Sequence, residues 1–148
     1  MFVAATPRSQ GRLAIAQAMG CRGVDTEELQ DWQGPRISTV LDAAGTAASV
    51  RAALRVVDRG GTVALPGVAS PIGEVGIDVY TELARKNVRL QGVWVSDAAH
   101  LHRAVGLVLS KRYNLEMLVT HRFPLSQANE ALQSVASREA VKAVLVPE

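Results

Sequence analysis

The three histidines and the single cysteine are the residues whose types could bind a metal or act in catalysis. His100 and His102 are two residues apart in a segment with helical periodicity. Since an α-helix has about 3.6 residues per turn, their side chains point roughly 160° apart and cannot chelate one metal ion. His121 stands alone in VTHRF, and Cys21 has no second cysteine or nearby histidine. These residues predict no metal centre, and we expect His121 and Cys21 to be structural.

A cluster of hydroxyl and guanidinium groups follows the first apolar run. The segment TPRSQGR contains Thr6, Arg8, Ser9 and Arg12, directly after the β-type run from Phe2 to Thr6. In a strand and helix unit that binds a dinucleotide, the ribose of the adenosine lies at this turn. An acidic residue there would favour NAD, and its absence together with Arg8 favours the 2′-phosphate of NADP. A solvated helix cap is the alternative interpretation.

Other motifs of nucleotide and ester chemistry are missing from the sequence. There is no G-x-G-x-x-G, Walker A or G-x-S-x-G spacing. Gly60-Gly61 joins an expected helix to an expected strand, whereas a phosphate loop joins a strand to a helix, so we interpret the pair as a helix C-cap. Glu27-Glu28 lies at an expected helix N-terminus, where the helix dipole accounts for two carboxylates.

Strand-like and helix-like segments alternate along the chain. Polar residues are placed to cap the helices at their N-termini, and Gly20 and Asn87 are placed to end two of them. Asp25 and Glu28 have the spacing of a capping box for a brief further helix near Trp32. The expected caps of the four main helices and of the one near Tyr80 are Ser9, Thr46, Asp78, Asp97 and Ser126. The expected strands are 2–6, 21–25, 37–45, 62–67, 88–96 and 142–146.

This alternation predicts an α/β fold with a mostly parallel sheet and helices on both faces. The run ISTVLDAAG, residues 37–45, has apolar and β-branched residues at both parities, so we expect it to be a central strand covered on both faces. The helix after Thr46 carries Val50, Ala53, Leu54 and Val57 on one stripe.

Composition narrows the class of protein. The 148 residues suit a single domain, with hydrophobic content of 48% and charged content of 20%. The chain has 16 Lys and Arg residues and a net charge of +2. These cations are dispersed along the sequence with few aromatic residues between them, so we expect no nucleic-acid binding. No apolar stretch approaches the roughly 18 residues of a membrane span, and the N-terminus has no secretion signal. We therefore expect a cytoplasmic protein that does not contact membranes.

Three stretches in order resemble the cofactor-binding domain and the C-terminus of zinc-type medium-chain alcohol and polyol dehydrogenases. They are LDAAGTAASVRAALRVVDRGGTVALPG, LARKNVRLQGVW and LVTHRFPLSQANEALQSVASREAVKAVLVP. The opening FVAATPRSQGRLAIAQAMG resembles the second strand and following helix of that family's Rossmann domain. The resemblance implies a doubly wound, mostly parallel, Rossmann-like sheet that lacks the first strand and its glycine-rich loop. Residues 1–148 would then be a single truncated dinucleotide-binding-like domain.

The resemblance also implies contacts to NAD(P). Ala43, Ala44 and Gly45 match residues that border the adenosine and its ribose, and Lys142 matches a basic position that reaches the pyrophosphate. The ribose-discriminating turn is matched by Thr6 and Arg8. The residues that match backbone and apolar contacts to the nicotinamide are Pro66, Gly67, Val68, Val93 and Val95.

The chain departs from the family in having no catalytic zinc domain and no glycine-rich turn. We therefore expect no zinc in this chain, weak NAD(P) binding that leans towards NADP, and no dehydrogenase activity by this polypeptide alone. Two alternatives remain: a non-enzymatic, dimeric interaction module that binds no nucleotide, and one chain of a split dehydrogenase whose separate catalytic-domain chain brings the zinc.

Two expectations concern strand edges. The absent first strand would lie between FVAAT and ISTVLDAA, so we expect FVAAT to move over and pair in parallel with ISTVLDAA. The family joins subunits through the edge strand that corresponds to VWVSD, which implies a homodimer through Val93 to Asp97. KAVLV, residues 142–146, is a second edge that could self-associate.

Overall fold

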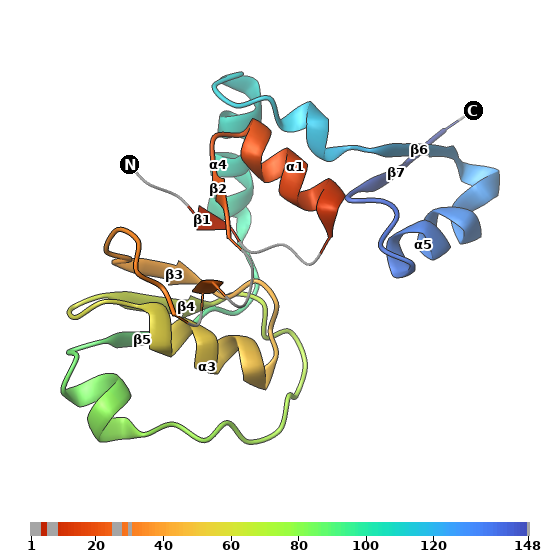
Figure 1. Ribbon diagram of the computed structural model, residues 1–148. Helices are drawn as coiled ribbons and strands as arrows, with labels where there is room; N and C mark the ends of the chain where they lie inside the picture. The colour runs from red at the N-terminus through yellow and green to blue at the C-terminus, as the bar shows by residue number, and fades with distance from the viewer. Residues whose placement is uncertain (1–3, 6–8, 25–27, 30, 148) are drawn as a thin grey trace. The chain divides into compact units, whose positions relative to one another are not determined.

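The computed structural model describes residues 4–5, 9–24, 28–29 and 31–147, and the chain divides into two compact units (Figure 1). The first unit contains residues 1–25 and 98–148, and the second contains residues 26–97. In the part of the chain that the structure describes, no helix is long and apolar enough to cross a membrane. All paired strands run parallel, which confirms the α/β class.

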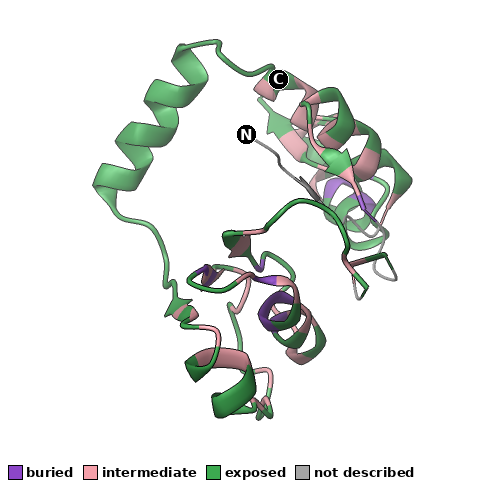
Figure 2. Cartoon of the chain, turned by 60° about the vertical axis from the view of Figure 1, so that its left-hand side comes forward, coloured by how far each residue is buried: buried purple, intermediate pink, exposed green. Residues whose placement is uncertain are grey.

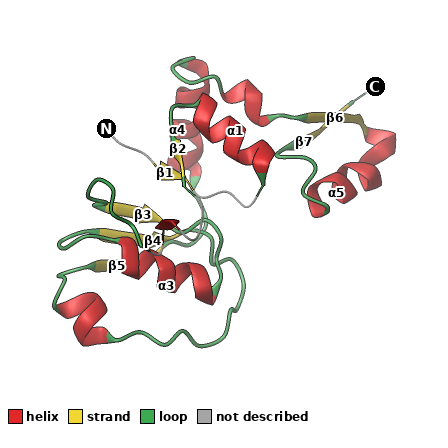
Figure 3. Cartoon of the chain, in the orientation of Figure 1, coloured by secondary structure: helices red, strands yellow, loops and turns green. Residues whose placement is uncertain are grey.

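The second unit is built on a three-stranded parallel sheet in the order β3-β4-β5. Its strands are β3 (Thr39–Leu41), β4 (Thr62–Leu65) and β5 (Arg89–Gly92). Helix α3 (Ala47–Val56) connects β3 to β4, while a long loop and the π-helix η1 (Val79–Ala84) connect β4 to β5 (Figure 3). Each connection crosses over so that the next strand can pair in parallel.

The core of this unit lies where α3 packs against the sheet (Figure 2). Its buried members include the whole stripe expected on the helix after Thr46, so that expectation is confirmed. Partly buried residues of the long loop, including Ile72, Val75 and Ile77, complete the cluster. The buried members are Val50, Ala53, Leu54, Val57 and Val63.

The caps expected for α3 and η1 are present. Thr46 Oγ1 accepts a hydrogen bond from Ser49 N at 3.1 Å, and Ser49 Oγ accepts one from Thr46 N at 2.9 Å, which together form a capping box. Asp78 caps η1 through the amides of Tyr80 and Thr81. Gly60 has a φ of 73°, but it lies in the turn after α3, whose C-cap is Val57, so the expected glycine C-cap is wrong.

The first unit begins with a short strand, a helix and a strand: β1 (Ala4–Ala5), α1 (Gln10–Ala18) and β2 (Arg22–Gly23). Ser9 caps α1 by accepting from Arg12 N at 3.4 Å, as expected. At the other end Gly20 has a φ of 86° and donates to Gln17 O, which forms the left-handed C-terminal turn that glycine favours.

The rest of the first unit has a second parallel pair of strands, β6 and β7. Helix α4 is exposed along its whole length (Figure 2) and ends earlier than the expected Tyr113. Ser126 was expected to cap α5, but the N-cap position is Gln127, because the 3₁₀ turn η3 precedes the helix. The elements are α4 (Ala98–Leu109), η2 (Leu115–Leu118), β6 (His121–Pro124), η3 (Leu125–Gln127), α5 (Ala128–Ala136) and β7 (Ala143–Val146).

The expected pairing of FVAAT with ISTVLDAA stays a prediction, because the two segments belong to different units. The described part of FVAAT, β1, pairs in parallel with β2, and β3 pairs in parallel with β4. The two short strands flank α1, so β1 reaches its partner by closing one local crossover, which costs less chain entropy than a distant pairing.

Two other strand expectations need correction. β3 is at an edge of its sheet, with β4 in the centre, and Leu41 is 68% exposed, so only one face of the strand is covered. The strand expected over 88–96 ends at Gly92, because its neighbour β4 ends at Leu65 and is followed by Pro66, which has no N–H to donate to a ladder. The capping box expected at Asp25 lies outside the described residues.

Candidate functional site

The candidate site lies at the carboxyl ends of β3 and β4. In the sheet register Leu41 is opposite Ala64, and Leu65 is opposite Gly92. The strands are parallel, so the segments that follow them start at the same edge of the sheet, where ligands of open α/β sheets bind. The structure thus brings together two of the segments expected to bind a dinucleotide, 43–45 after β3 and 66–68 after β4.

These two segments approach so closely that their glycines are required. A Cβ atom at Gly45 would overlap the carbonyl oxygen of Gly67, and Gly45 has a φ of 63°, which favours glycine. A Cβ atom at Gly67 would in turn lie 2.7 Å from the carbonyl oxygen of Asp42 and 2.8 Å from Gly45 N. The two strand ends therefore meet backbone to backbone.

Asp42 holds this edge together, although no motif of the sequence indicated it. The residue is 5% exposed, and its Oδ1 accepts hydrogen bonds from the amides of Ala44 at 3.0 Å and Gly45 at 3.2 Å. Its Oδ2 accepts from Ser49 Oγ at 3.1 Å, and its carbonyl oxygen accepts from Gly67 N at 2.8 Å. One buried carboxylate thus fixes the turn after β3 and joins it to α3.

A sequence feature could have indicated Asp42. It is the one charged residue in the apolar run ISTVLDAAG, and it stands three residues before Gly45. A carboxylate at the end of a strand can accept the amides of the turn that follows it, in the way of an Asx turn. The predicted residues Ala44 and Gly45 are therefore positioned by Asp42.

The surface of the edge carries only small or apolar side chains. Ala43 and Ala44 are exposed and present methyl groups, while Pro66 is exposed and Val68 is half-buried against the core cluster. Such a surface lets a flat ring or a sugar approach the backbone closely. It offers no described acid or base for proton transfer.

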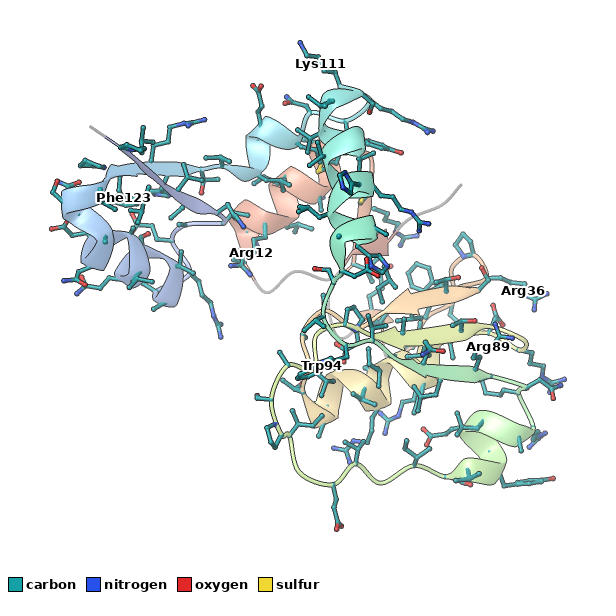
Figure 4. The ribbon with its side chains drawn as sticks, turned by 180° about the vertical axis from the view of Figure 1, so that it is seen from behind. Arg12, Arg36, Arg89, Trp94, Lys111 and Phe123 are labelled. Atoms are coloured by element: carbon teal, nitrogen blue, oxygen red, sulfur yellow. The ribbon has the colours of Figure 1, made fainter. Side chains whose placement is uncertain are left out.

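Val93 and Val95 follow β5, whose carboxyl end is at the same edge of the sheet. Their side chains are 42% and 75% exposed, and Val95 has a φ of 39°, an uncommon conformation for a β-branched residue. Figure 4 shows Trp94, which stands between them, at this end of the sheet, with Arg36 and Arg89 at the opposite end.

The structure does not test the other three predicted residues. Thr6 and Arg8 are outside the described residues. Lys142 belongs to the first unit, just before β7, where its carbonyl oxygen accepts hydrogen bonds from the amides of Thr120 and His121. The roles expected for these three residues stay predictions.

The histidines do not form a metal site. His100 and His102 are exposed on α4, and His121 Nδ1 lies 3.0 Å from Thr120 Oγ1 while its ring stacks on Phe123 at 6.1 Å between centroids. Across the described ranges, no group of three or more His, Cys, Asp or Glu residues could hold a metal ion.

Known proteins resemble this chain in both sequence and fold. Residues 1–110 match the family model described as zinc-binding dehydrogenase. Sorbitol dehydrogenase of Gallus gallus is 32% identical over 105 residues, which are 71% of this chain and 28% of that protein.

Solved structures agree with this match. An alcohol dehydrogenase from Thermotoga maritima superposes with a TM-score of 0.89 and 31% identity, over 100% of this chain and 44% of that one. The NADP complex of a protein described as a zinc-binding dehydrogenase, from Sinorhizobium meliloti, superposes with a TM-score of 0.87 over 99% of this chain and 45% of that one. Its identity is 23%, so it supports the fold alone. The chain thus spans less than half the length of these relatives, and it belongs to the zinc-binding dehydrogenase family.

Proposed function

We propose that the edge formed by residues 43–45 and 66–68 binds NAD(P), as part of a dehydrogenase that acts on an alcohol or a polyol. The observation that carries the proposal is the close crossing of Gly45 and Gly67, which leaves a surface of backbone and methyl groups at the carboxyl end of a parallel sheet. Asp42 keeps this surface fixed before a ligand arrives, so little ordering entropy is lost on binding.

The residues of this edge fit a dinucleotide by shape rather than by charge. When bound, the nicotinamide would supply the hydride acceptor or donor of the reaction. Ala43, Ala44 and Gly45 would border the adenosine and its ribose, and Pro66, Gly67 and Val68 would lie against the nicotinamide and hold water away from it. Val93 and Val95 would add apolar contacts from the end of β5.

We expect NADP to bind more tightly than NAD. Arg8 would pair with the 2′-phosphate, because a guanidinium donates two parallel hydrogen bonds to phosphate oxygens. Lys142 would approach the pyrophosphate. Relatives named for sorbitol and alcohols support the substrate class.

Isothermal titration calorimetry of the full chain with NADP and with NAD tests the proposal. We expect weak, saturable binding, with NADP favoured, and we expect Arg8→Ala to remove the preference for NADP. Arg103→Ala, an equally charged change on the exposed face of α4, is the matched control and should leave both affinities unchanged.

Two outcomes would contradict the proposal in different ways. Absence of binding at millimolar cofactor would favour a non-enzymatic interaction module. Binding that appears only when a zinc-containing polypeptide co-purifies would favour one chain of a split dehydrogenase, because the second chain would then complete the site.

We also propose a homodimer formed through residues 93–97. β5 is one of the two outer strands of its sheet, and an outer strand presents unpaired backbone groups to a second chain. The segment that continues it exposes Val93, Trp94 and Val95, which are large apolar side chains. A two-fold axis through this segment would bury all three side chains of both copies.

A further inference from the structure

A cleft in the second unit lies at the amino ends of the strands. It is opposite the edge formed by residues 43–45 and 66–68, which we call the nucleotide edge. Its volume is about 580 Å³, within the range of small-molecule sites. Arg36, Arg59 and Lys86 line it, and each lies three residues before a strand, β3, β4 and β5 respectively. Because the strands are parallel, these three cations come from segments that meet at one end of the sheet.

Two more arginines line the cleft. Arg55 is in the last turn of α3, which runs back towards the amino ends of the strands, and Arg85 follows η1. Among the described lining residues, Asp58 is the one carboxylate. In that part of the chain the cleft therefore gathers five cationic side chains against one acidic side chain, although the charge of the whole chain is only +2.

The local partners of two cations are already present. Arg36 Nε lies 3.4 Å from Asp58 Oδ2, and the same oxygen accepts a hydrogen bond from Ile37 N at 3.1 Å. Lys86 Nζ donates to the carbonyl oxygens of Leu54 at 2.8 Å and Arg55 at 3.2 Å. Lys86 thus caps the C-terminus of α3 through two backbone carbonyl groups.

The three remaining cations form no ion pair within the described part of the chain. Among the residues that the structure describes, no carboxylate forms an ion pair with Arg55, Arg59 or Arg85. Guanidinium groups that converge on one cleft repel each other and keep their donors solvated, so a bound anion relieves the repulsion and accepts several charge-assisted hydrogen bonds. A halide ion is a single small acceptor, whereas linked phosphates carry many acceptor oxygens and can reach several separate guanidinium groups.

We propose that this cleft binds a small anion with two or more linked phosphate groups. The site is separate from the nucleotide edge, because its residues precede the strands whose far ends form that edge. Trp32 also lines the cleft, where its Nε1 donates to Pro35 O at 2.9 Å, so its indole reports on an occupant.

Inorganic tripolyphosphate is the probe for the test, and Trp32 is the reporter. In the full chain carrying Trp94→Phe, Trp32 is the single tryptophan. We expect titration with tripolyphosphate to change its fluorescence in a saturable way. We also expect the anion iodide to quench it strongly before the titration and weakly after it, while neutral acrylamide shows a smaller difference.

Charge variants locate the site. Arg55→Gln/Arg59→Gln should weaken tripolyphosphate binding about tenfold or more, because two charge-assisted donors are lost. Arg51→Gln/Arg103→Gln removes the same charge from exposed helix positions outside the cleft and should leave the affinity within about twofold at matched ionic strength. Circular dichroism and the unfolding midpoint of each variant establish that it folds.

Three results would overturn the proposal. One is the absence of saturable binding by the folded Trp94→Phe chain at millimolar tripolyphosphate. Another is equal weakening by both pairs of arginine substitutions, which would indicate a diffuse electrostatic effect. The third is displacement of tripolyphosphate in direct competition by adenosine, which carries no phosphate, because this would place the anion at the nucleotide edge.

Discussion

At the scale of single residues, the nucleotide edge depends on residues with little chemistry of their own. Gly45 and Gly67 allow two backbones to meet, and Asp42 holds the turn that follows β3. The resemblance to dehydrogenases could predict the glycines, because it matches positions in order along the chain. It did not indicate Asp42, since a buried carboxylate gains its role only when the register places its neighbours.

Gly45→Ala should destabilise the second unit and disturb the nucleotide edge. The new Cβ atom would overlap Gly67 O, and the positive φ would strain any side chain, so we expect a loss of more than about 1 kcal/mol in the free energy of unfolding. Urea denaturation measures it. Gly76→Ala is the matched control, since no heavy atom lies within 4 Å of its Cβ position. Equal stability of the two variants would show that the glycines do not meet.

Asp42→Asn should destabilise the same turn by a different route. An amide keeps the shape but replaces one acceptor oxygen with a donor, so the hydrogen bonds from the two amides and from Ser49 Oγ cannot all persist. We expect a loss of about 1–3 kcal/mol by urea denaturation. Glu74→Gln, an exposed change in the same unit, should cost less than about 0.5 kcal/mol. A loss of that small size at Asp42 would contradict its role.

The helix cap formed by Asp78 should depend on pH. A hydrogen bond from Thr81 Oγ1 at 2.6 Å, with those from the amides of Thr81 and Tyr80, lowers the pKa of its carboxyl below the ordinary value. The cap therefore stabilises η1 above the unfolded pKa, and this contribution is lost as the pH falls through the folded pKa. Carbon-detected NMR titration should show that Thr81→Val raises the pKa of Asp78. Tyr80→Phe keeps every one of these hydrogen bonds, so an equal rise there would refute the assignment.

At the scale of elements, local chemistry predicted helices better than strands. The caps at Ser9, Thr46 and Asp78 and the turn at Gly20 form as expected, because each depends on hydrogen bonds within a few residues. The neighbours of each strand depend on distant segments, which periodicity does not reveal. For that reason β3 was expected in the centre of its sheet, although it lies at an edge.

The two helix caps should differ in strength. Thr46→Ala removes half of a capping box with bonds of 2.9 and 3.1 Å, and we expect it to cost about 1 kcal/mol in the free energy of unfolding. Ser9→Ala removes one exposed bond of 3.4 Å and should cost only a few tenths. Thermal denaturation of both variants checks the order. A larger loss at Ser9 than at Thr46 would contradict it.

At the scale of the whole molecule, the described strands pair in parallel as β1-β2, β3-β4-β5 and β6-β7. The α/β class could be predicted from the alternation of patterns, and the Rossmann likeness followed from the order of three motifs. The partners of each strand could not be predicted in this way, because strands of the same composition can hydrogen-bond their backbone groups to more than one neighbour. Here β1 and β2 satisfy each other, as do β6 and β7.

Because β5 is an outer strand of its sheet, we expect the whole molecule to self-associate. If residues 93–97 join two copies, Trp94→Glu should convert the dimer to a monomer, because a carboxylate would be buried without a partner at the two-fold axis. Sedimentation velocity measures the change. Tyr80→Glu is the matched control: Tyr80 is 71% exposed, comparable to 75% for Trp94, but lies on η1 away from the segment. A dimer that persists in Trp94→Glu, or a native chain that sediments as a monomer, would exclude this interface. Loss of the dimer in both variants would instead indicate nonspecific apolar association, since added charge alone would then separate the copies.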